Sequence, residues 1–551
     1  MLTRSEINEA ILNTIVSDWK ASQRLADMIE SDAYYNSENT GIMSRKRVVA
    51  FADEVPGEPD DNGLPTTHTN IYTKEDLRKA NHKLPHGFHF ELVNQVKNLL
   101  VGEPVRISWK TDDDGAPVHA NVDGLDDAET GITGHAIITD DIKQVIDDIL
   151  FVHNDWGTFN QENVKNNQKY AEAWMRVTIN PKTGFPLMLN INSKEIIDFE
   201  DEFGDLTCVI RVYTVEKYDD KGKKYEVDYA EVYDDEYKDV YSRTRKNGKF
   251  KLDIADVPLL QTTTAFDDGS GNVIEGETTS LSWGRIPFVK WKFNDEKLTA
   301  LKPIKPFIDL MDIELSDLGN DIEDWREAIW VLENYHGQSV SDFLNDLNTK
   351  HVIKVGDGGN ARPERNEIPY DARLKMYEVL EKNVYRYGRG INFGDRNNLG
   401  NISGVGLKWS YELLEEKANE IEVYGQTALN SLFKLIFRYL TVAQITAEDL
   451  DVNDLEFIFR RSLLINEKDD VETLVKASAF LSDKTILEHL PMVDDAEDEM
   501  KRLEEEGKDN FNEAENEALA ADAIRQLELE EDKKVSDKGN DKTSAKYYGQ
   551  D

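Results

Sequence analysis

The sequence is poor in cysteine and has no long apolar runs. Its 551 residues include a single cysteine, Cys208, which cannot form an intramolecular disulfide bond. This composition fits a reducing, cytosolic setting. No apolar run is long enough to cross a bilayer, and the first residues, MLTRSEINEAILNTIV, carry acidic and polar side chains within their apolar stretch. We therefore expect a soluble intracellular protein that has no signal peptide and makes no membrane contact.

Basic residues are scarce relative to acidic ones. The chain has 65 lysines and arginines against 108 aspartates and glutamates, a formal net charge of −43. A protein that binds nucleic acid without regard to sequence normally carries a basic face, whereas this chain repels phosphate on average. Two possibilities follow: nucleic acid plays no part, or it passes close to the protein without being held.

The motifs of the common enzymes and metal sites are missing. There is no G-x-x-x-x-G-K-[ST], no G-x-S-x-G and no pair of C-x-x-C motifs, and the acid-rich turns TDDDG, NVDG and FDDG fail the calcium-loop pattern. His82, His86 and His89 have the spacing of metal ligands on a helix, but Pro85 and Gly87 between them disfavour a helix there. We therefore expect no cofactor, no metal site and no enzymatic activity.

The first half of the chain contains both helical and strand-like patterns. Apolar residues recur at helical spacing over 1–35, 87–101 and about 140–153. The breaker-rich stretch 55–66 predicts a loop. Between about 170 and 295 the period changes to two, which predicts an antiparallel meander, and Asn247-Gly248 within KNGK is a strong hairpin signal.

From residue 304 the helical spacing returns with a period of 3.5, which predicts narrow packing seams. The first seam contains Ile304, Ile308, Met311, Leu315, Leu318, Ile322, Trp325, Ile329 and Leu332. After a helix over about 371–391, the second contains Leu407, Tyr411, Leu414, Ala418, Ile421, Gly425, Ala428, Leu432, Leu435 and Tyr439. DLEFIFRRSLL predicts a strand, 467–481 and 484–506 two helices, and acidic 508–551 a mobile tail with a possible short helix. The predicted fold class is α+β, predominantly helical.

A long polar loop, NFGDRNNLGNISGVGL at 392–407, separates two of these helices. Glycine and asparagine tolerate unusual backbone angles, so the loop can change shape at little cost. It is nearly uncharged because Asp395 and Arg396 cancel, so it could touch a polyanion without gripping it. A plain linker is the alternative. The seams likewise allow two interpretations, packing within one chain or packing between neighbouring subunits around an enclosed space.

Several stretches resemble one family. They are AYYNSENTGIMSRKR, NHKLPHGFHFELVNQVKNLLVGEPV, SWGRIPFVKWKF, WVLENYHGQSVSDFLNDLNTKHVIKV, EIPYDA with the following glycine-rich loop and long helix, and FIFRRSLLINEKDDVETL. In this order, over about 25–505, the chain resembles the portal protein of long-tailed double-stranded DNA bacteriophages, the siphophage portal family. The asparagine-rich loop and the acidic tail depart from the family pattern.

The resemblance implies a ring, usually a dodecamer and possibly a tridecamer in isolation, at one vertex of the capsid. A separate terminase pumps double-stranded DNA through its axis during genome packaging, a head–tail adaptor docks later, and the genome leaves by the same route at ejection. Major capsid and scaffold proteins are the other implied partners. The implied location is the virion, after capsid assembly in the bacterial cytoplasm.

The resemblance also implies a domain map. It assigns 1–300 to the wing, 301–333 to a stem helix, 334–369 to the clip, 370–391 to a second stem helix, 392–407 to the tunnel loop, 408–440 to a long helix bridging channel and wing, 441–465 to a returning wing strand, 466–507 to the crown, and 508–551 to the acidic tail.

Three sets of candidate site residues follow from this map. The loop residues expected to contact DNA are Asn392, Arg396, Asn397, Asn398, Asn401 and Ser403. The acidic residues expected to line the channel and repel DNA are Asp317, Asp321, Asp324 and Glu327. The residues expected to dock partners at the clip are Lys350, Lys354, Arg362 and Arg365. The alternative is an acidic helical scaffold or adaptor protein without a channel; a nuclease would need a metal motif that the sequence lacks.

Overall fold

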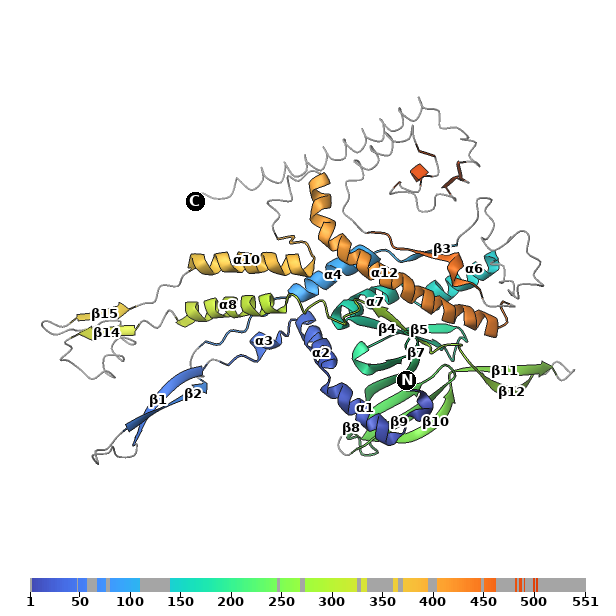
Figure 1. Ribbon diagram of the computed structural model, residues 1–551, viewed down its shortest axis with the longest axis horizontal. Coiled ribbons are helices and arrows are strands. Elements are labelled where there is room, and N and C mark those ends of the chain that lie inside the picture. The colour runs from blue at the N-terminus through green and yellow to red at the C-terminus, as the bar shows by residue number, and fades with distance from the viewer. Residues whose placement is uncertain are drawn as a thin grey trace, which may run out of the picture. The chain divides into compact units, whose positions relative to one another are not determined.

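The computed structural model in Figure 1 describes most of the chain. The described residues are 2–46, 48–56, 67–75, 80–109, 139–244, 248–267, 273–324, 329–333, 360–364, 370–394, 404–446 and 450–461, with short pieces between 481 and 503. The chain divides into two compact units, residues 1–394 with 411–462 and residues 395–410 with 463–551. The side-chain contacts described below lie within the first unit.

The N-terminal region contains two helices where the sequence predicts one over 1–35. After a short turn at Arg4–Glu6, helix α1 spans Glu9–Ala21 and α2 spans Gln23–Tyr35. The Asn8 side chain caps α1 by accepting hydrogen bonds from the amides of the next residues. The expectation of one helix is wrong because Ser22 has an extended backbone and its hydroxyl caps the start of α2. The one-turn helix α3, Thr40–Met43, follows.

A long hairpin follows α3. Strand β1, Val48–Pro56, pairs antiparallel with β2, Thr67–Glu75, in an unbroken register. The sequence analysis assigns only a loop at 55–66 here, because β2 reads THTNIYTKE and has no apolar alternation. Residues 55 and 56 belong to β1, and the rest of that loop lies outside the described residues.

The predicted antiparallel meander is confirmed. Its five-stranded sheet has the order β10-β9-β8-β7-β6, and a three-stranded sheet has the order β13-β4-β5. The strands are β4 (Glu172–Ile179), β5 (Pro186–Ile191), β6 (Ile196–Glu200), β7 (Leu206–Tyr218), β8 (Lys224–Tyr233), β9 (Tyr237–Thr244), β10 (Lys251–Pro258) and β13 (Phe288–Lys292). Two further pairs are β11 (Leu260–Asp267) with β12 (Val273–Leu281), and β3 (Arg106–Trp109) with β16 (Leu455–Ile458). β9 and β10 are the neighbours that the hairpin signal at Asn247-Gly248 predicts.

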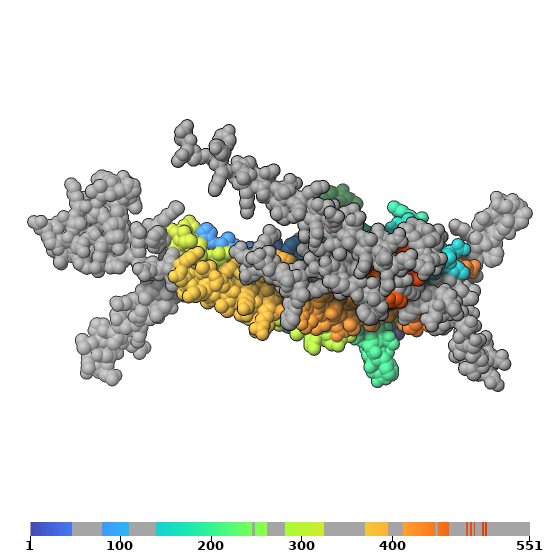
Figure 2. Space-filling view, turned by 90° about the horizontal axis from the view of Figure 1, so that it is seen from above, coloured from blue at the N-terminus to red at the C-terminus, as the bar shows by residue number. Residues whose placement is uncertain are grey.

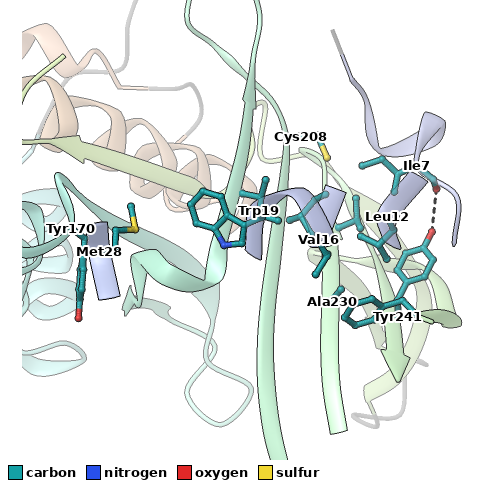
Figure 3. Close-up of a cluster of buried hydrophobic side chains, with 13 residues drawn as sticks. Ile7, Leu12, Val16, Trp19, Met28, Tyr170, Cys208, Ala230 and Tyr241 are labelled. Carbon is teal, nitrogen blue, oxygen red and sulfur yellow. Dashed lines mark hydrogen bonds between the residues drawn. The ribbon is translucent and has the colours of Figure 1, made fainter. Parts of the chain in front are cut away.

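Helix α1 closes one face of the five-stranded sheet. Figure 3 shows Leu12, Val16 and Trp19 of α1 turned toward the strand residues Cys208 and Ala230. These side chains form one buried cluster, so burial of the apolar face of α1 stabilises the contact. Burial also raises the pKa of the Cys208 thiol to about 12, so this cysteine stays protonated.

The other helices confirm most of the helical predictions and correct their ends. They are α4 (Phe88–Val101), α6 (Asp140–Asp147) continued by a π-helical turn (Asp148–Val152), α7 (Trp156–Tyr170), α8 (Lys305–Asp324), α10 (Tyr370–Gly388) and α12 (Gly404–Val442). The predicted helices at 467–481 and 484–506 lie largely outside the described residues, and the tail at 508–551 lies wholly outside them.

The predicted stem helix over 301–333 is wrong at its C-terminal end. Helix α8 ends at Asp324, and Ile329–Glu333 forms strand β14, which pairs antiparallel with β15, Asn360–Glu364. The run IWVLE is rich in β-branched and aromatic residues, which favour a strand when a partner is available. The second stem helix ends at Gly388 rather than 391, and α12 starts at Gly404, so the last residues of the predicted loop 392–407 are helical.

Candidate functional site

The two predicted stem helices pack against each other within one chain. Ile308 and Met311 of α8 are buried in the same cluster as Leu380 and Val384 of α10. The second seam, on α12, is also buried within the chain at its described positions from Tyr411 to Tyr439. Of the two interpretations left open by the seams, packing within one chain therefore holds for these positions.

A second face of α8 is polar yet buried. Asp312, Ser316 and Asn320 recur every fourth residue and are almost completely covered. Their side-chain oxygens accept hydrogen bonds from the backbone N–H groups of His86 at 2.8 Å, Leu84 at 3.0 Å and His82 at 2.7 Å, respectively.

This match has a simple geometric cause. Two residues of extended chain rise about 6.6 Å, and four residues of helix rise about 6.0 Å. The segment 82–86, here called the strap, can therefore lie along α8 and present every second amide to every fourth side chain. The polar stripe of α8 holds the strap in register.

The strap also joins α8 to α10 and α3. The His86 ring contacts Asp312 Oδ1 through Nδ1 at 2.7 Å and the Tyr377 hydroxyl of α10 through Nε2 at 2.9 Å. Asn39, the residue before α3, donates to Asp312 Oδ2 at 2.6 Å and to the carbonyl oxygen of His86 at 3.1 Å. Asp312 therefore accepts hydrogen bonds from two separate segments and is the centre of a buried polar network.

The three histidines singled out in the sequence have separate partners. His82 contacts Glu323 at 2.7 Å, His86 contacts Asp312, and His89 contacts the Ser31 hydroxyl at 2.9 Å. Burial, with the nearby ammonium groups of Lys417 and Lys169, lowers the pKa of His89 to about 3. Within the residues that the structure describes, no group of three or more histidine, cysteine or carboxylate side chains could hold a metal ion.

The predicted acidic lining is partly paired. Asp317 forms an ion pair with Arg45 at 2.8 Å, and Asp321 forms one with Arg373 at 2.8 Å. Each of these carboxylates is about one third exposed. Asp324 is the last residue of α8, and its side chain and all of Glu327 lie outside the described parts of the chain.

The predicted loop begins at a tightly docked segment, residues 388–391, here called the loop root. A Cβ atom on Gly388 would lie 2.5 Å from Leu92 of α4, and one on Gly390 would lie closer still, so both positions need glycine for this approach. Gln95 of α4 accepts a hydrogen bond from the amide of Ile391 at 2.8 Å and donates one to its carbonyl oxygen at 2.7 Å. The root is therefore fixed to α4 on both sides of its backbone.

Few of the other predicted site residues can be placed. Asn392 follows the root, and its side chain accepts a hydrogen bond from the amide of Gly394 at 2.8 Å. Arg362 lies in β15 opposite Val331, with its side chain outside the described atoms. The remaining loop and clip candidates lie outside the described residues: Arg396, Asn397, Asn398, Asn401, Ser403, Lys350, Lys354 and Arg365.

A buried ion network behind the site has no signal in the sequence. Lys290 of β13 pairs with Asp198 of β6 at 2.7 Å, and Arg24 of α2 pairs with the same carboxylate at 3.1 Å and with Glu172 of β4. Burial alone would raise the pKa of Asp198, but Lys290 and Arg24 outweigh it and lower the pKa to about 2. These partners are far apart in the sequence, so only the fold brings them together.

Helix α10 leaves apolar side chains uncovered on its outer face. Val379 is 60% exposed and Tyr387 is 51% exposed, and Leu374 is also exposed. Figure 2 shows the exposed surfaces of α10, in yellow-orange, and of the following part of α12, in orange, on the same side of the molecule. Exposed apolar side chains gathered on one element are typical of a contact with another protein.

Known proteins resemble the chain over most of its length. The family described as "Phage portal protein, SPP1 Gp6-like" matches residues 19–513. The portal protein of Bacillus phage SPP1 is 26% identical over 437 residues, which cover 78% of this chain and 77% of that protein. The portal protein of Clostridium phage phiCD119 is 34% identical over 243 residues, 43% of this chain, and the match spans about half (52%) of that protein's length.

One solved structure is also similar, although weakly. It is described as the neck of an empty GTA particle computed with C6 symmetry, and it matches with 8% sequence identity, a TM-score of 0.38, and coverage of 73% of this chain and 89% of its own. Because the family match extends over most of the chain, the protein belongs to the phage portal proteins of the SPP1 Gp6-like family. Within the described residues, no helix is both long enough and apolar enough to cross a membrane.

Proposed function

We propose that copies of this chain form a ring at one vertex of a phage capsid, and that viral DNA is packaged through the centre of this ring. The family membership carries the proposal. The strongly acidic composition supports it, because an acidic wall lets a polyanion move where a basic wall would hold it by releasing counterions. The expected partners are a terminase, a head–tail adaptor, and capsid and scaffold proteins. The ring is expected to have twelve subunits, or thirteen in isolation.

In this proposal α8 and α10 are the stem, and residues 1–300 with about 441–465 are the wing. The hairpin of β14 and β15 begins and ends the clip, where Lys350, Lys354, Arg362 and Arg365 would contact the terminase and later the adaptor. The loop after residue 391 would contact DNA. Residues 466–507 would form the crown. The mutual packing of α8 and α10 supports a stem built from both helices of each subunit.

The exposed face of α10 is proposed as a contact between subunits. In a ring, one face of each subunit meets a different face of the next, so an uncovered apolar face is expected before assembly. Val379→Glu would place a charge in this contact, and burial of an unpaired charge opposes association. We expect a folded chain that fails to form rings, measured as particle mass and by negative-stain imaging.

Phe203→Glu is the matched control for this prediction. Phe203 is 81% exposed in the turn between β6 and β7, far in sequence from the stem helices, and the substitution adds the same charge. The control should still form rings. Rings formed by Val379→Glu with the wild-type mass would show that α10 does not contribute this contact.

The acidic lining gives a second prediction. Amide substitutions at Asp317, Asp321, Asp324 and Glu327 are expected to slow DNA packaging, because they remove repulsion and leave Arg45 and Arg373 without their carboxylate partners. Both changes increase phosphate binding by the stem. The measurement is the packaging rate with purified terminase at two salt concentrations, since salt weakens phosphate binding and should restore part of the rate.

The control for this experiment has the same change in net charge elsewhere. Four exposed or half-exposed carboxylates of the sheet region can be replaced by amides: Glu202, Asp205, Glu216 and Asp220. Packaging by this variant should match the wild type. An unchanged packaging rate and unchanged DNA retention in the stem variant would refute the acidic lining at these positions.

A further inference from the structure

One buried lysine contacts the root of the proposed DNA-contacting loop. Lys417 lies on α12 and is 3% exposed. Its Nζ donates a hydrogen bond to the carbonyl oxygen of Gly388 at 3.2 Å. Gly388 is the last residue of α10, so the acceptor is one of the carbonyl groups that a helix leaves without an intrahelical partner. A cation at this end of α10 also interacts favourably with the helix dipole.

The surroundings of Lys417 are unusual for a buried ammonium group. Buried lysines normally pair with carboxylates, but within the described part of the chain this one donates to a carbonyl oxygen and lies 6.0 Å from the centre of the Phe293 ring. Burial, and then the charge of Arg389, lowers the pKa of Lys417 to about 7, although Glu420 opposes the shift. The charge of this group therefore changes near neutral pH.

The other charged groups around Lys417 do not titrate in the same range. Arg389 follows α10 and pairs with Glu420 of α12 at 2.7 Å. His89 of α4 has a pKa of about 3 and is neutral at neutral pH. Lys169 of α7 pairs with Asp32 of α2 at 2.5 Å, and this pair holds the pKa of Asp32 at about 2 against the effect of burial. Near pH 7, Lys417 is thus the group among these whose charge changes.

The root has one fixed side and one side that can change. On α4, the two glycines and the paired hydrogen bonds of Gln95 hold it without any titrating group. On α12, the hydrogen bond from Lys417 and the exposed ion pair of Arg389 with Glu420 hold it. Exposed ion pairs contribute little to stability, so the buried ammonium group is the main attachment of the root to α12.

We propose that Lys417 is a positioning residue for the DNA-contacting loop: its ammonium group holds the loop root against α12, and loss of its proton releases the root from that helix. The inference rests on the proposed role of the loop in contacting DNA. With the root attached to both helices, the loop begins at a fixed point beside α12. With the root attached to α4 alone, the loop can shift relative to α12 while the fold is unchanged.

Hydrogen exchange of the full-length chain, followed by mass spectrometry, tests this proposal. The amides of Arg389, Gly390 and Ile391 report on the root, because they donate to Arg386 O at 3.3 Å, Tyr385 O at 2.9 Å and Gln95 Oε1 at 2.8 Å. After correction for the intrinsic effect of pH, we expect their protection in the wild type to fall about tenfold between pH 6 and pH 8.5, as for the loss of one charge-assisted hydrogen bond.

Three variants separate charge from packing. Lys417→Met should show weak protection of the root at both pH values, and Lys417→Arg, which does not titrate, should show strong protection at both. Lys434→Met, at an exposed position of the same helix, should behave like the wild type. If Lys417→Met or Lys417→Arg fails to fold, the pH profile of the wild type still decides.

Two results would overturn the proposal. One is wild-type protection of 389–391 that is equal at pH 6 and pH 8.5, and the other is full protection in Lys417→Met. Neither result depends on DNA, so the exchange experiment can fail while the loop still proves necessary for packaging. Conversely, a loop that proves dispensable for packaging would remove the function of the attachment but not the attachment itself.

Discussion

Deletion of residues 396–402 should leave the chain folded and able to form rings, but reduce DNA packaging to the background level. The fold should survive because the root at 388–391 is held by Leu92 and Gln95 of α4. From Tyr411 onward α12 is held by its own buried residues. The deleted residues include most of the side chains proposed to contact DNA, with Arg396 as the only cation among them.

A variant of unchanged length separates the chemistry of the loop from its reach. Replacement of 396–402 by glycine and serine residues keeps the length and flexibility but removes Arg396 and the asparagines. If side-chain contacts matter, this variant should package poorly although its rings have the wild-type mass. Normal packaging by rings of the deletion variant would show that the loop does not act on DNA and is a plain linker.

The largest expected effect on stability comes from Asp312→Ala. This substitution leaves the amide and ring nitrogen of His86 and the side-chain amide of Asn39 without their acceptor in a buried region. Each buried donor left unsatisfied costs about 1–3 kcal/mol, so the combined loss is about 3 kcal/mol or more. The strap should detach from α8 first, because it is held along that helix by three such contacts.

Two measurements check this expectation. Hydrogen exchange should show loss of protection at the amides of His82, Leu84 and His86, and thermal unfolding of the full chain should begin at a lower temperature. Glu314→Ala removes one carboxylate from the same helix at a half-buried position and should change neither result. Unchanged protection of the strap in Asp312→Ala would mean that the polar stripe does not hold it.

Local periodicity was sufficient to predict much of the fold. The helices α4, α10 and α12 and the five-stranded meander follow from apolar residues at spacings of about 3.5 or 2, which neighbouring positions decide. The same reasoning fails where distant segments decide. The apolar seam continues through Ile329 and Leu332, but pairing with β15, which starts at Asn360, turns these residues into a strand.

The polar contacts of α8 were less accessible to prediction than its apolar seam. Aspartates such as Asp312 and Asp317 look like a solvated acidic face in the sequence, because nothing local reveals their partners. The partners are His86 and Arg45, more than two hundred residues away. A spacing of four between Asp312, Ser316 and Asn320 beside every second residue of 82–86 is a weak signal that becomes clear once the two segments are seen together.

The mass of the purified full-length particle tests the central claim most directly. The account predicts a closed ring with a central hole and about twelve or thirteen times the chain mass of 63.0 kDa, seen by mass measurement and by negative-stain images of the same sample. If rings do not form with the chain alone, the measurement is repeated with the scaffold protein present. A stable monomer or dimer under both conditions would contradict the channel and favour an acidic adaptor protein.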